Sequence, residues 1–152
     1  MNFEHCTEES TNKIVSVSEN RMTFVVLNDD RNRIRKVQVD GCLIDDERER
    51  CDYLFEIYDP SSLVIYLELK GHKIDNAANQ LEATLSYCQK VHHGLKRCCY
   101  IVASRVPKTG PKVQVLKKKF FQKHKVHLIV KTRVAKVSLP LTEVCMSGGG
   151  GP

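Results

Sequence analysis

The spacing of hydrophobic and polar positions changes several times along the chain. Residues 33–39 (RIRKVQV) alternate polar and apolar side chains, and short apolar-rich runs occupy 13–18 (KIVSVS) and 22–27 (MTFVVL). A period of two is typical of half-buried β-strands, so these segments predict an N-terminal β-meander over about 13–40. We expect its turns at Glu19-Asn20, at 28–32 and at Asp40-Gly41.

The middle of the chain is more apolar. Residues 52–58 (DYLFEIY) and 63–69 (LVIYLEL) predict two strands joined by a turn at 59–62, and the second reads as covered on both faces. From Ile74 to about Val91, apolar residues recur at spacings of three and four, which predicts an amphipathic helix. Further elements are expected as a strand over 98–104, a second helix over 112–124, and strands over 126–130 and 134–139.

This order of elements predicts an α/β fold with a central mixed sheet and helices on its faces. The chain has 152 residues, of which 41% are hydrophobic and 28% charged, as in one packed domain. We therefore expect a single domain over 1–146. It divides into the meander, a core over about 51–104 and a basic part over 105–146, followed by a flexible tail at 147–152.

The net charge of +6 is unevenly distributed. Residues 1–60 carry 8 basic and 14 acidic side chains, a net charge of −6, and residues 61–90 carry 3 of each. Residues 91–152 carry 13 basic and 1 acidic side chain, a net charge of +12. Such asymmetry favours a polyanionic partner for the C-terminal half, with nucleic acid ahead of an anionic membrane, although a solvated lysine-rich surface explains it equally well.

Seven cysteines form no C-x-x-C pair, and the first 15 residues do not resemble a secretory signal. We therefore expect reduced thiols, a cytoplasmic protein and no disulfides. The cluster Cys88, His92, His93, Cys98 and Cys99 matches no common zinc spacing. No apolar run approaches the roughly 18–20 residues that span a bilayer, so no membrane association is expected.

In the predicted strand over 63–69, charged residues occur only at the C-terminal end. Glu68 and Lys70 point to one face of that strand, and Asp52 begins the preceding strand at a similar distance from the turn. Two carboxylates and an ammonium group then converge. The simplest interpretation is an ion pair at a strand end. The alternative is a Mg²⁺ site of Asp52, Glu68 and the main-chain carbonyl of Leu69, where Lys70 activates or orients water.

The order Asp52 … Glu68-Leu69-Lys70, across a hairpin and before a helix and a buried strand, resembles the PD-(D/E)XK nuclease superfamily. The string CDYLFEIYDPSSLVIYLELKGHKIDNAANQLEATL is similar to small bacterial members, which place Q-L-x-x-T on the helix. The match covers about residues 51–85, with looser agreement to 104. The resemblance implies a restriction-endonuclease-like three-layer α/β/α core and metal-dependent phosphodiester cleavage.

Carried over by position, Asp52 and Glu68 would bind Mg²⁺ or Mn²⁺, Lys70 would be the catalytic lysine, and Gln80 would match a glutamine of the superfamily. Lys73 and Thr84 share a helix flank with Gln80 and could reach a phosphate, although a plain polar pair of Gln80 and Thr84 is the alternative. An additional carboxylate is left open between Glu4, Glu8, Asp40 and Glu56. The basic residues expected to follow a nucleic-acid backbone are Lys112, Lys117, Lys118, Lys119 and Lys123.

The sequence thus predicts a Mg²⁺-dependent nuclease, acting on DNA in preference to RNA. Two alternatives belong to other classes. One is a catalytically inactive nucleic-acid-binding subunit, and the other is a protein-interaction partner in a larger defence or repair complex. A homodimer is a further possibility, since cutting both strands of a duplex at once needs two sites.

Overall fold

The computed structural model describes residues 2–58, 62–70, 73–105 and 110–141, without the side chains of residues 110 and 111. The predicted turn at 59–62 and the loop before the second helix fall largely outside these ranges, and the predicted tail at 147–152 does so entirely. The strands are β1 (Thr7–Ser10), β2 (Ile14–Glu19), β3 (Met22–Leu27), β4 (Arg33–Gln38), β5 (Tyr53–Tyr58), β6 (Leu63–Lys70), β7 (Lys96–Ala103), β8 (His127–Thr132) and β9 (Val134–Ser138). The helices are the 3-10 helix η1 (Glu4–Cys6) and the α-helices α1 (Ile74–Tyr87) and α2 (Gly110–His124).

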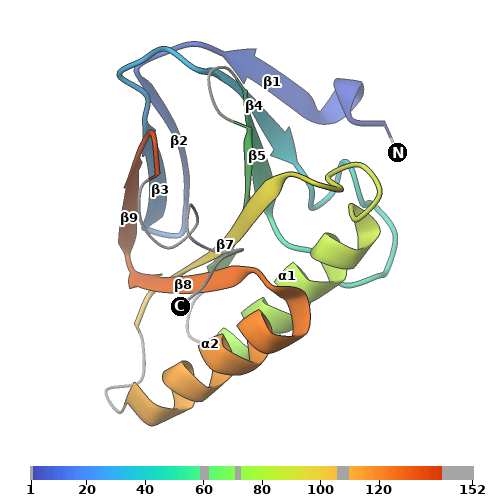
Figure 1. The fold of residues 1–152 in the computed structure, drawn as a ribbon, viewed down its shortest axis with the longest axis vertical. Coiled ribbons are helices and arrows are strands. Elements are labelled where there is room, and N and C mark those ends of the chain that lie inside the picture. Colours follow the sequence, from blue (N-terminus) through green and yellow to red (C-terminus); the bar gives the residue numbers. More distant parts are fainter. Residues whose placement is uncertain (1, 59–61, 71–72, 106–109, 142–152) are drawn as a thin grey trace.

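Six strands form a mixed sheet in the order β1-β4-β5-β6-β7-β8 (Figure 1). Strands β6, β7 and β8 run parallel to one another, whereas the pairs β1·β4, β4·β5 and β5·β6 are antiparallel. The α/β class and the mixed sheet are therefore confirmed. A second sheet, with the order β2-β3-β9, joins the N-terminal hairpin to the last strand of the described chain.

The predicted N-terminal meander is wrong in its pairing. Strands β2 and β3 form a hairpin in the small sheet, but β4 pairs with β1 and β5 in the large one. The cause is a corner after β3, where the buried amide of Asn28 donates to the carbonyl of Asn32 (2.8 Å) and accepts from its backbone N–H (2.8 Å). These side-chain hydrogen bonds replace backbone pairing, so the chain can change sheets here.

The described elements form three layers, with both α-helices on one face of the large sheet and the small sheet on the other. Helix α1 packs on β6 and β7, and α2 packs on β8. The expected α/β/α layering differs from this helix–sheet–sheet order. Apolar residues on both faces of β6 require cover on each side, but they do not determine whether helices or strands supply it.

A disulfide joins Cys6, at the end of η1, to Cys42 in the loop after β4. This contradicts the expectation of a chain without disulfides. Cys51, Cys88 and Cys99 are buried free thiols. In the described part of the chain, no helix is both long enough and apolar enough to cross a bilayer.

Candidate active site

The site begins with the register of the β5–β6 hairpin. Tyr53 is paired with Leu67, and the backbone N–H of Asp52 donates to the carbonyl of Leu67 (3.1 Å). Asp52 therefore lies opposite Glu68, as the position of the turn predicted. Residues opposite each other in an antiparallel pair point to the same face, so both carboxyl groups lie on the helix-covered side of the large sheet.

The side chain of Asp52 completes the hydrogen-bond ladder where β5 begins. Its Oδ2 atom accepts a hydrogen bond from the backbone N–H of Leu69 (2.8 Å). Its own carbonyl accepts from the N–H groups of Val39 (2.9 Å) and Asp40 (3.2 Å) at the end of β4. Asp52 is thus held between two neighbouring strands, and its position does not depend on a flexible loop.

Glu68 is a buried carboxyl group with an exposed fraction of only 3%. Burial, and then the nearby charge of Asp52, raise the pKa of Glu68 to about 9. Burial also raises the pKa of Asp52 to about 6, and the charges of Glu19 and Asp40 act in the same direction. The pair therefore carries protons at pH values where ordinary carboxyl groups have lost them, unless a cation is bound.

The two oxygens of Glu68 have different surroundings. The side-chain amide of Gln80, oriented with its nitrogen toward the site, donates to Oε2 of Glu68 (2.8 Å) and to the carbonyl of Asn76 (3.3 Å). The other oxygen, Oε1, is buried and has no hydrogen-bond partner. A buried carboxylate oxygen without a partner is costly, which is the situation that a bound cation relieves.

Lys70 lies two residues beyond Glu68, is partly buried, and its positive charge opposes the rise in the pKa of Glu68. It is paired with Ala103 at the end of β7. Lys73 immediately precedes α1 and is exposed. Both lysines therefore lie at the end of the large sheet where the two carboxyl groups converge.

Thr84 has a different role from the predicted phosphate contact, because its side chain is fully buried. Its Oγ1 atom accepts a hydrogen bond from the backbone N–H of Cys51 (2.8 Å) and donates to the carbonyl of Gln80 (3.0 Å). One hydroxyl thus links α1 to the residue before Asp52. Helical spacing correctly predicted that Thr84 and Gln80 lie on the same flank of α1. It did not show that this flank faces the start of β5.

Three of the four candidates for an additional carboxylate lie in other interactions. Glu4 pairs with Arg35 (3.4 Å) and Glu8 pairs with Lys36 (3.8 Å), both in β4. Glu56 is buried between Arg35 and His92. The fourth, Asp40, is exposed and pairs with Arg50 (2.8 Å) beside a hollow that is also lined by Arg48 and Gln80.

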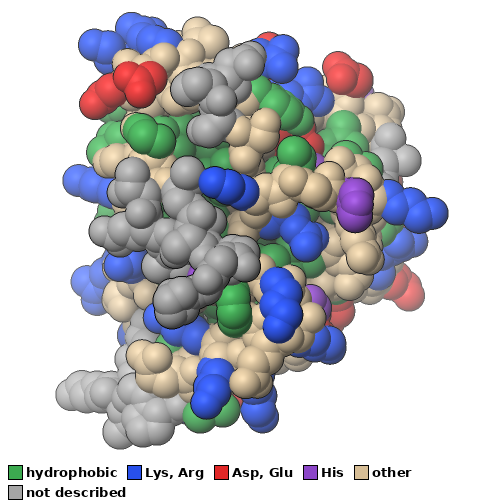
Figure 2. Space-filling view, viewed as in Figure 1, with side chains coloured by type: hydrophobic (Ala, Val, Ile, Leu, Met, Phe, Trp, Pro, Cys, Tyr) green, Lys and Arg blue, Asp and Glu red, His purple; other side chains and the backbone are tan. Residues whose placement is uncertain are grey.

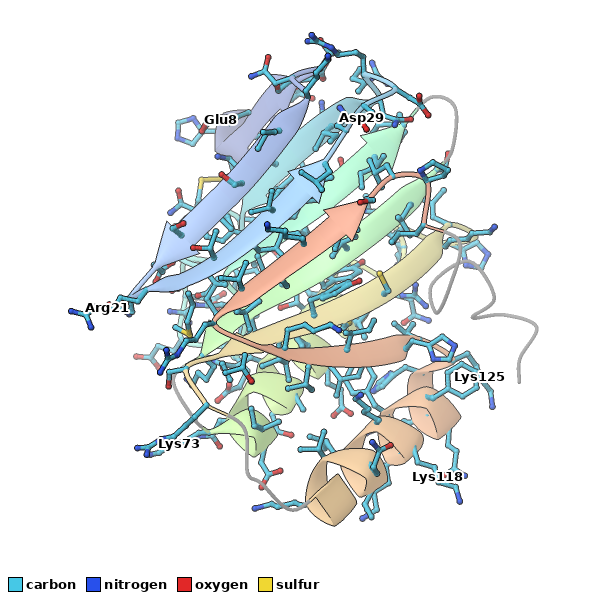
Figure 3. All side chains as sticks on the ribbon, turned by 90° about the vertical axis from the view of Figure 1, so that its left-hand side faces the viewer. Glu8, Arg21, Asp29, Lys73, Lys118 and Lys125 are labelled. Carbon is cyan, nitrogen blue, oxygen red and sulfur yellow. A yellow bond between two sulfur atoms is a disulfide. The ribbon has the colours of Figure 1, made fainter. Side chains whose placement is uncertain are left out.

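Among the lysines of α2, Lys112 lines a hollow together with Lys73 at the start of α1. Lys112 pairs with Asp75 (3.3 Å) and Lys123 with Glu82 (3.3 Å), both on α1. Figure 3 shows Lys73 and Lys118 on different sides of the molecule. In Figure 2, the Lys and Arg side chains of the described residues are scattered and form no continuous stripe on the face shown. The predicted contacts Lys117, Lys118 and Lys119 are carried by this same helix.

The donor set predicted from the sequence for a divalent cation consists of Asp52, Glu68 and the carbonyl of Leu69. The carbonyl faces the same neighbouring strand as the N–H that contacts Asp52, because both groups of one residue point to the same side of a strand. Hard oxygen donors fit Mg²⁺ or Mn²⁺. No cluster of three or more His, Cys, Asp or Glu side chains that could hold a metal occurs in the described parts of the chain.

The sequence analysis missed two features. Arg48 and Arg50 lie in a charged loop and border the hollow next to Gln80. The ring of His92 is buried, away from this hollow, and the one available signal for it was the charged Glu56 inside an otherwise apolar strand. In comparisons with known proteins, the chain matches no family model, no curated protein and no solved structure.

Proposed function

We propose that the protein is a metal-dependent nuclease that hydrolyses phosphodiester bonds, in DNA in preference to RNA. The single observation that carries the proposal is the buried Oε1 atom of Glu68, which has no hydrogen-bond partner, in a carboxyl group that interacts electrostatically with the carboxyl group of Asp52. A structural ion pair would satisfy this oxygen. The order of Asp52, Glu68 and Lys70 along the hairpin supports the same function through its resemblance to PD-(D/E)XK nucleases.

Each residue has a distinct part in the proposed reaction. Asp52 and Glu68 hold the cation, which when bound polarises the phosphate and activates water for attack. Lys70 stabilises the negative charge that develops on the phosphoryl oxygens. Gln80 orients Glu68 through Oε2, and this leaves Oε1 for the cation. Since the pKa of Glu68 is about 9 and that of Asp52 about 6, cation binding displaces protons and becomes stronger as the pH rises.

A catalytically inactive nucleic-acid-binding subunit is the second candidate. The observation that favours it is the small donor set, because among the described residues no third His, Cys, Asp or Glu side chain joins Asp52 and Glu68 in a group that could hold a metal. Such a subunit would bind nucleic acid with a strong dependence on salt but would show no Mg²⁺-stimulated turnover.

The test is cleavage of plasmid, linear duplex, single-stranded DNA and RNA in Mg²⁺ or Mn²⁺, with EDTA as the negative condition. We expect metal-dependent cleavage that falls about 100-fold or more in Asp52→Asn, Glu68→Gln and Lys70→Met. The matched controls are Asp29→Asn and Lys13→Met, which exchange the same residue types at exposed positions beside the Asn28 corner, away from the site. Cleavage by Asp52→Asn and Glu68→Gln at the rate of the unmodified protein would disprove the proposal. Metal-independent cleavage would do the same.

A further inference from the structure

Arg133 lies in the connection between β8 and β9, where the two sheets meet. Its backbone N–H donates to the carbonyl of Ala103 (2.7 Å), and its carbonyl accepts from the N–H of Thr23 (2.8 Å). Ala103 is the partner of Lys70 in the β6–β7 register. The backbone of Arg133 is therefore about two strand spacings, or roughly 10 Å, from that of Lys70.

Arg21 lies in the turn between β2 and β3, two residues before Thr23, and so belongs to the same edge. Figure 3 shows the side chains of Arg21 and Lys73 projecting from one side of the molecule. An independent sign of proximity is that the charge of Glu19, which ends β2, acts on Asp52. The small sheet thus brings one of its turns to the candidate active site.

Turn geometry does not explain arginine at either position. Arg21 and Arg133 both have φ 65°, in the left-handed region that favours glycine and asparagine over other residues. Both side chains are exposed, and neither guanidinium forms an ion pair with any described residue. The fold therefore leaves both guanidinium groups available to a partner outside the chain.

The lysines of α2 contrast with these arginines. Lys112 and Lys123 are paired with acidic residues of α1, and Lys118 and Lys125 project from the side opposite Arg21 in Figure 3. Arg21 and Arg133 therefore lie near the end of the large sheet that carries Lys70 and Lys73, where the exposed side chains of Lys131 and Arg105 also lie.

We propose that Arg21 and Arg133 form a subsite for the phosphate backbone of the nucleic acid, next to the phosphate that is cleaved. This inference rests on the proposed function and deepens it. A guanidinium group binds a phosphate through two parallel hydrogen bonds, which a lysine cannot match. The small sheet, which contributes no ligand to the cation, then serves to hold the substrate across the edge of the large sheet.

The experiment measures binding of a short fluorescent DNA duplex and its single strand without metal, in EDTA, over a range of salt concentrations. The variants are Arg21→Asn, Arg133→Asn and the double variant, because asparagine tolerates positive φ and keeps the turns. The matched control is Arg31→Asn. Arg31 is also exposed, has φ 55° and lies in the turn after β3, at the far end of that strand.

We expect each single variant to bind several-fold more weakly and the double variant at least 10-fold more weakly, with Arg31→Asn nearly unchanged. Each lost phosphate contact should reduce the slope of log affinity against log salt by about 0.9 for duplex DNA and about 0.7 for a single strand. Thermal unfolding of each variant confirms that it is folded. An unchanged double variant would overturn the inference, and so would an equal loss in Arg31→Asn, which would indicate a general charge effect.

The outcome is separable from that of the proposed function because binding is measured without metal. Arginine-dependent binding without any metal-dependent cleavage would support the subsite and reject the nuclease. Cleavage that proceeds with full affinity in the double variant would support the nuclease and reject the subsite. Failure of the unmodified protein to bind either DNA would overturn the subsite as well.

Discussion

Two buried glutamates on neighbouring strands, both on the helix-covered face of the large sheet, have opposite surroundings. Glu56 in β5 is 4% exposed and Glu68 in β6 is 3% exposed. Both oxygens of Glu56 have partners, since Oε1 accepts from Arg35 (3.0 Å) and Oε2 contacts His92 (2.6 Å), whose ring also contacts Tyr66. Glu68 has Gln80 at one oxygen and no partner at the other.

The pKa values follow this difference. Burial raises the pKa of both groups, but in Glu56 the hydrogen bonds and charges of His92 and Arg35 outweigh it and lower the pKa. In Glu68 burial and the charge of Asp52 act together and raise the pKa to about 9. Burial alone therefore does not identify a functional carboxylate. The informative feature is a buried acid whose negative charge the protein itself does not compensate.

The largest loss of stability is expected when Glu56 loses its negative charge. Glu56→Gln removes the charge that compensates Arg35 and, when protonated, His92. We expect it to lower the free energy of unfolding by about 3 kcal/mol, as for other broken buried ion pairs. Chemical denaturation at pH 7 measures the change. Unfolding at the same denaturant concentration as the unmodified protein would show that this network contributes little.

Glu68→Gln is expected to act in the opposite direction. The pKa of Glu68 is about 9 in the folded protein, so the group keeps its proton up to about that pH, while the unfolded chain loses it above the ordinary glutamate pKa of 4.5. The folded state therefore binds more protons between these values, and the free energy of unfolding falls as the pH rises through this window. The variant removes this penalty, which accumulates at about 1.4 kcal/mol per pH unit within the window, so we expect it to be several kcal/mol more stable at pH 8 and unchanged at pH 4.

Thermal and denaturant unfolding at the two pH values, both without metal, give the measurement for Glu68→Gln. Its control is Glu49→Gln, since Glu49 is exposed and should show no such pH dependence. A variant that is less stable than the unmodified protein at pH 8 would mean that Glu68 has a stabilising partner there, and the contrast with Glu56 would be lost.

The smallest change in stability is expected for substitution of Thr84. Its variants test whether this residue also positions Asp52. Thr84→Val keeps the shape of the side chain but leaves the buried N–H of Cys51 without an acceptor, at a cost of about 1 kcal/mol. Because that N–H precedes Asp52, we also expect a weaker apparent affinity for Mg²⁺ in the cleavage assay. Thr84→Ser should restore both. Equal metal affinity in Thr84→Val and the unmodified protein would limit Thr84 to a purely structural role.

The sequence was sufficient for the features that depend on local pattern and on distance from a turn. The spacing of Ile74, Ala77, Ala78 and Leu81 predicted α1, and the turn position predicted that Asp52 faces the end of β6. Identical reasoning could not predict strand β1, since TEES is polar and becomes a strand only because β4 supplies its partner. The parallel pair of β3 and β9 was also out of reach, because it joins distant segments.

The site shows the same limit. Residue type indicated cations on α2, but not that Asp75 and Glu82 of α1 would pair with two of them. Helical periodicity gave the flank on which Thr84 lies, but a period contains no information about which neighbouring strand that flank meets. No local pattern singled out Arg21 or Arg133, because only the assembled sheets bring them close to Lys70.

The pairing of β9 with β3 has a consequence for how the chain acquires its structure. More than 100 residues separate Thr23 from its partner Val134. During synthesis from the N-terminus, the hairpin β2–β3 and the hairpin β5–β6 both emerge long before β9. The small sheet can reach its final form only after β9 has left the ribosome. Since contacts between distant segments form slowly, closure of this sheet is expected to be a late step that completes the edge of the candidate active site.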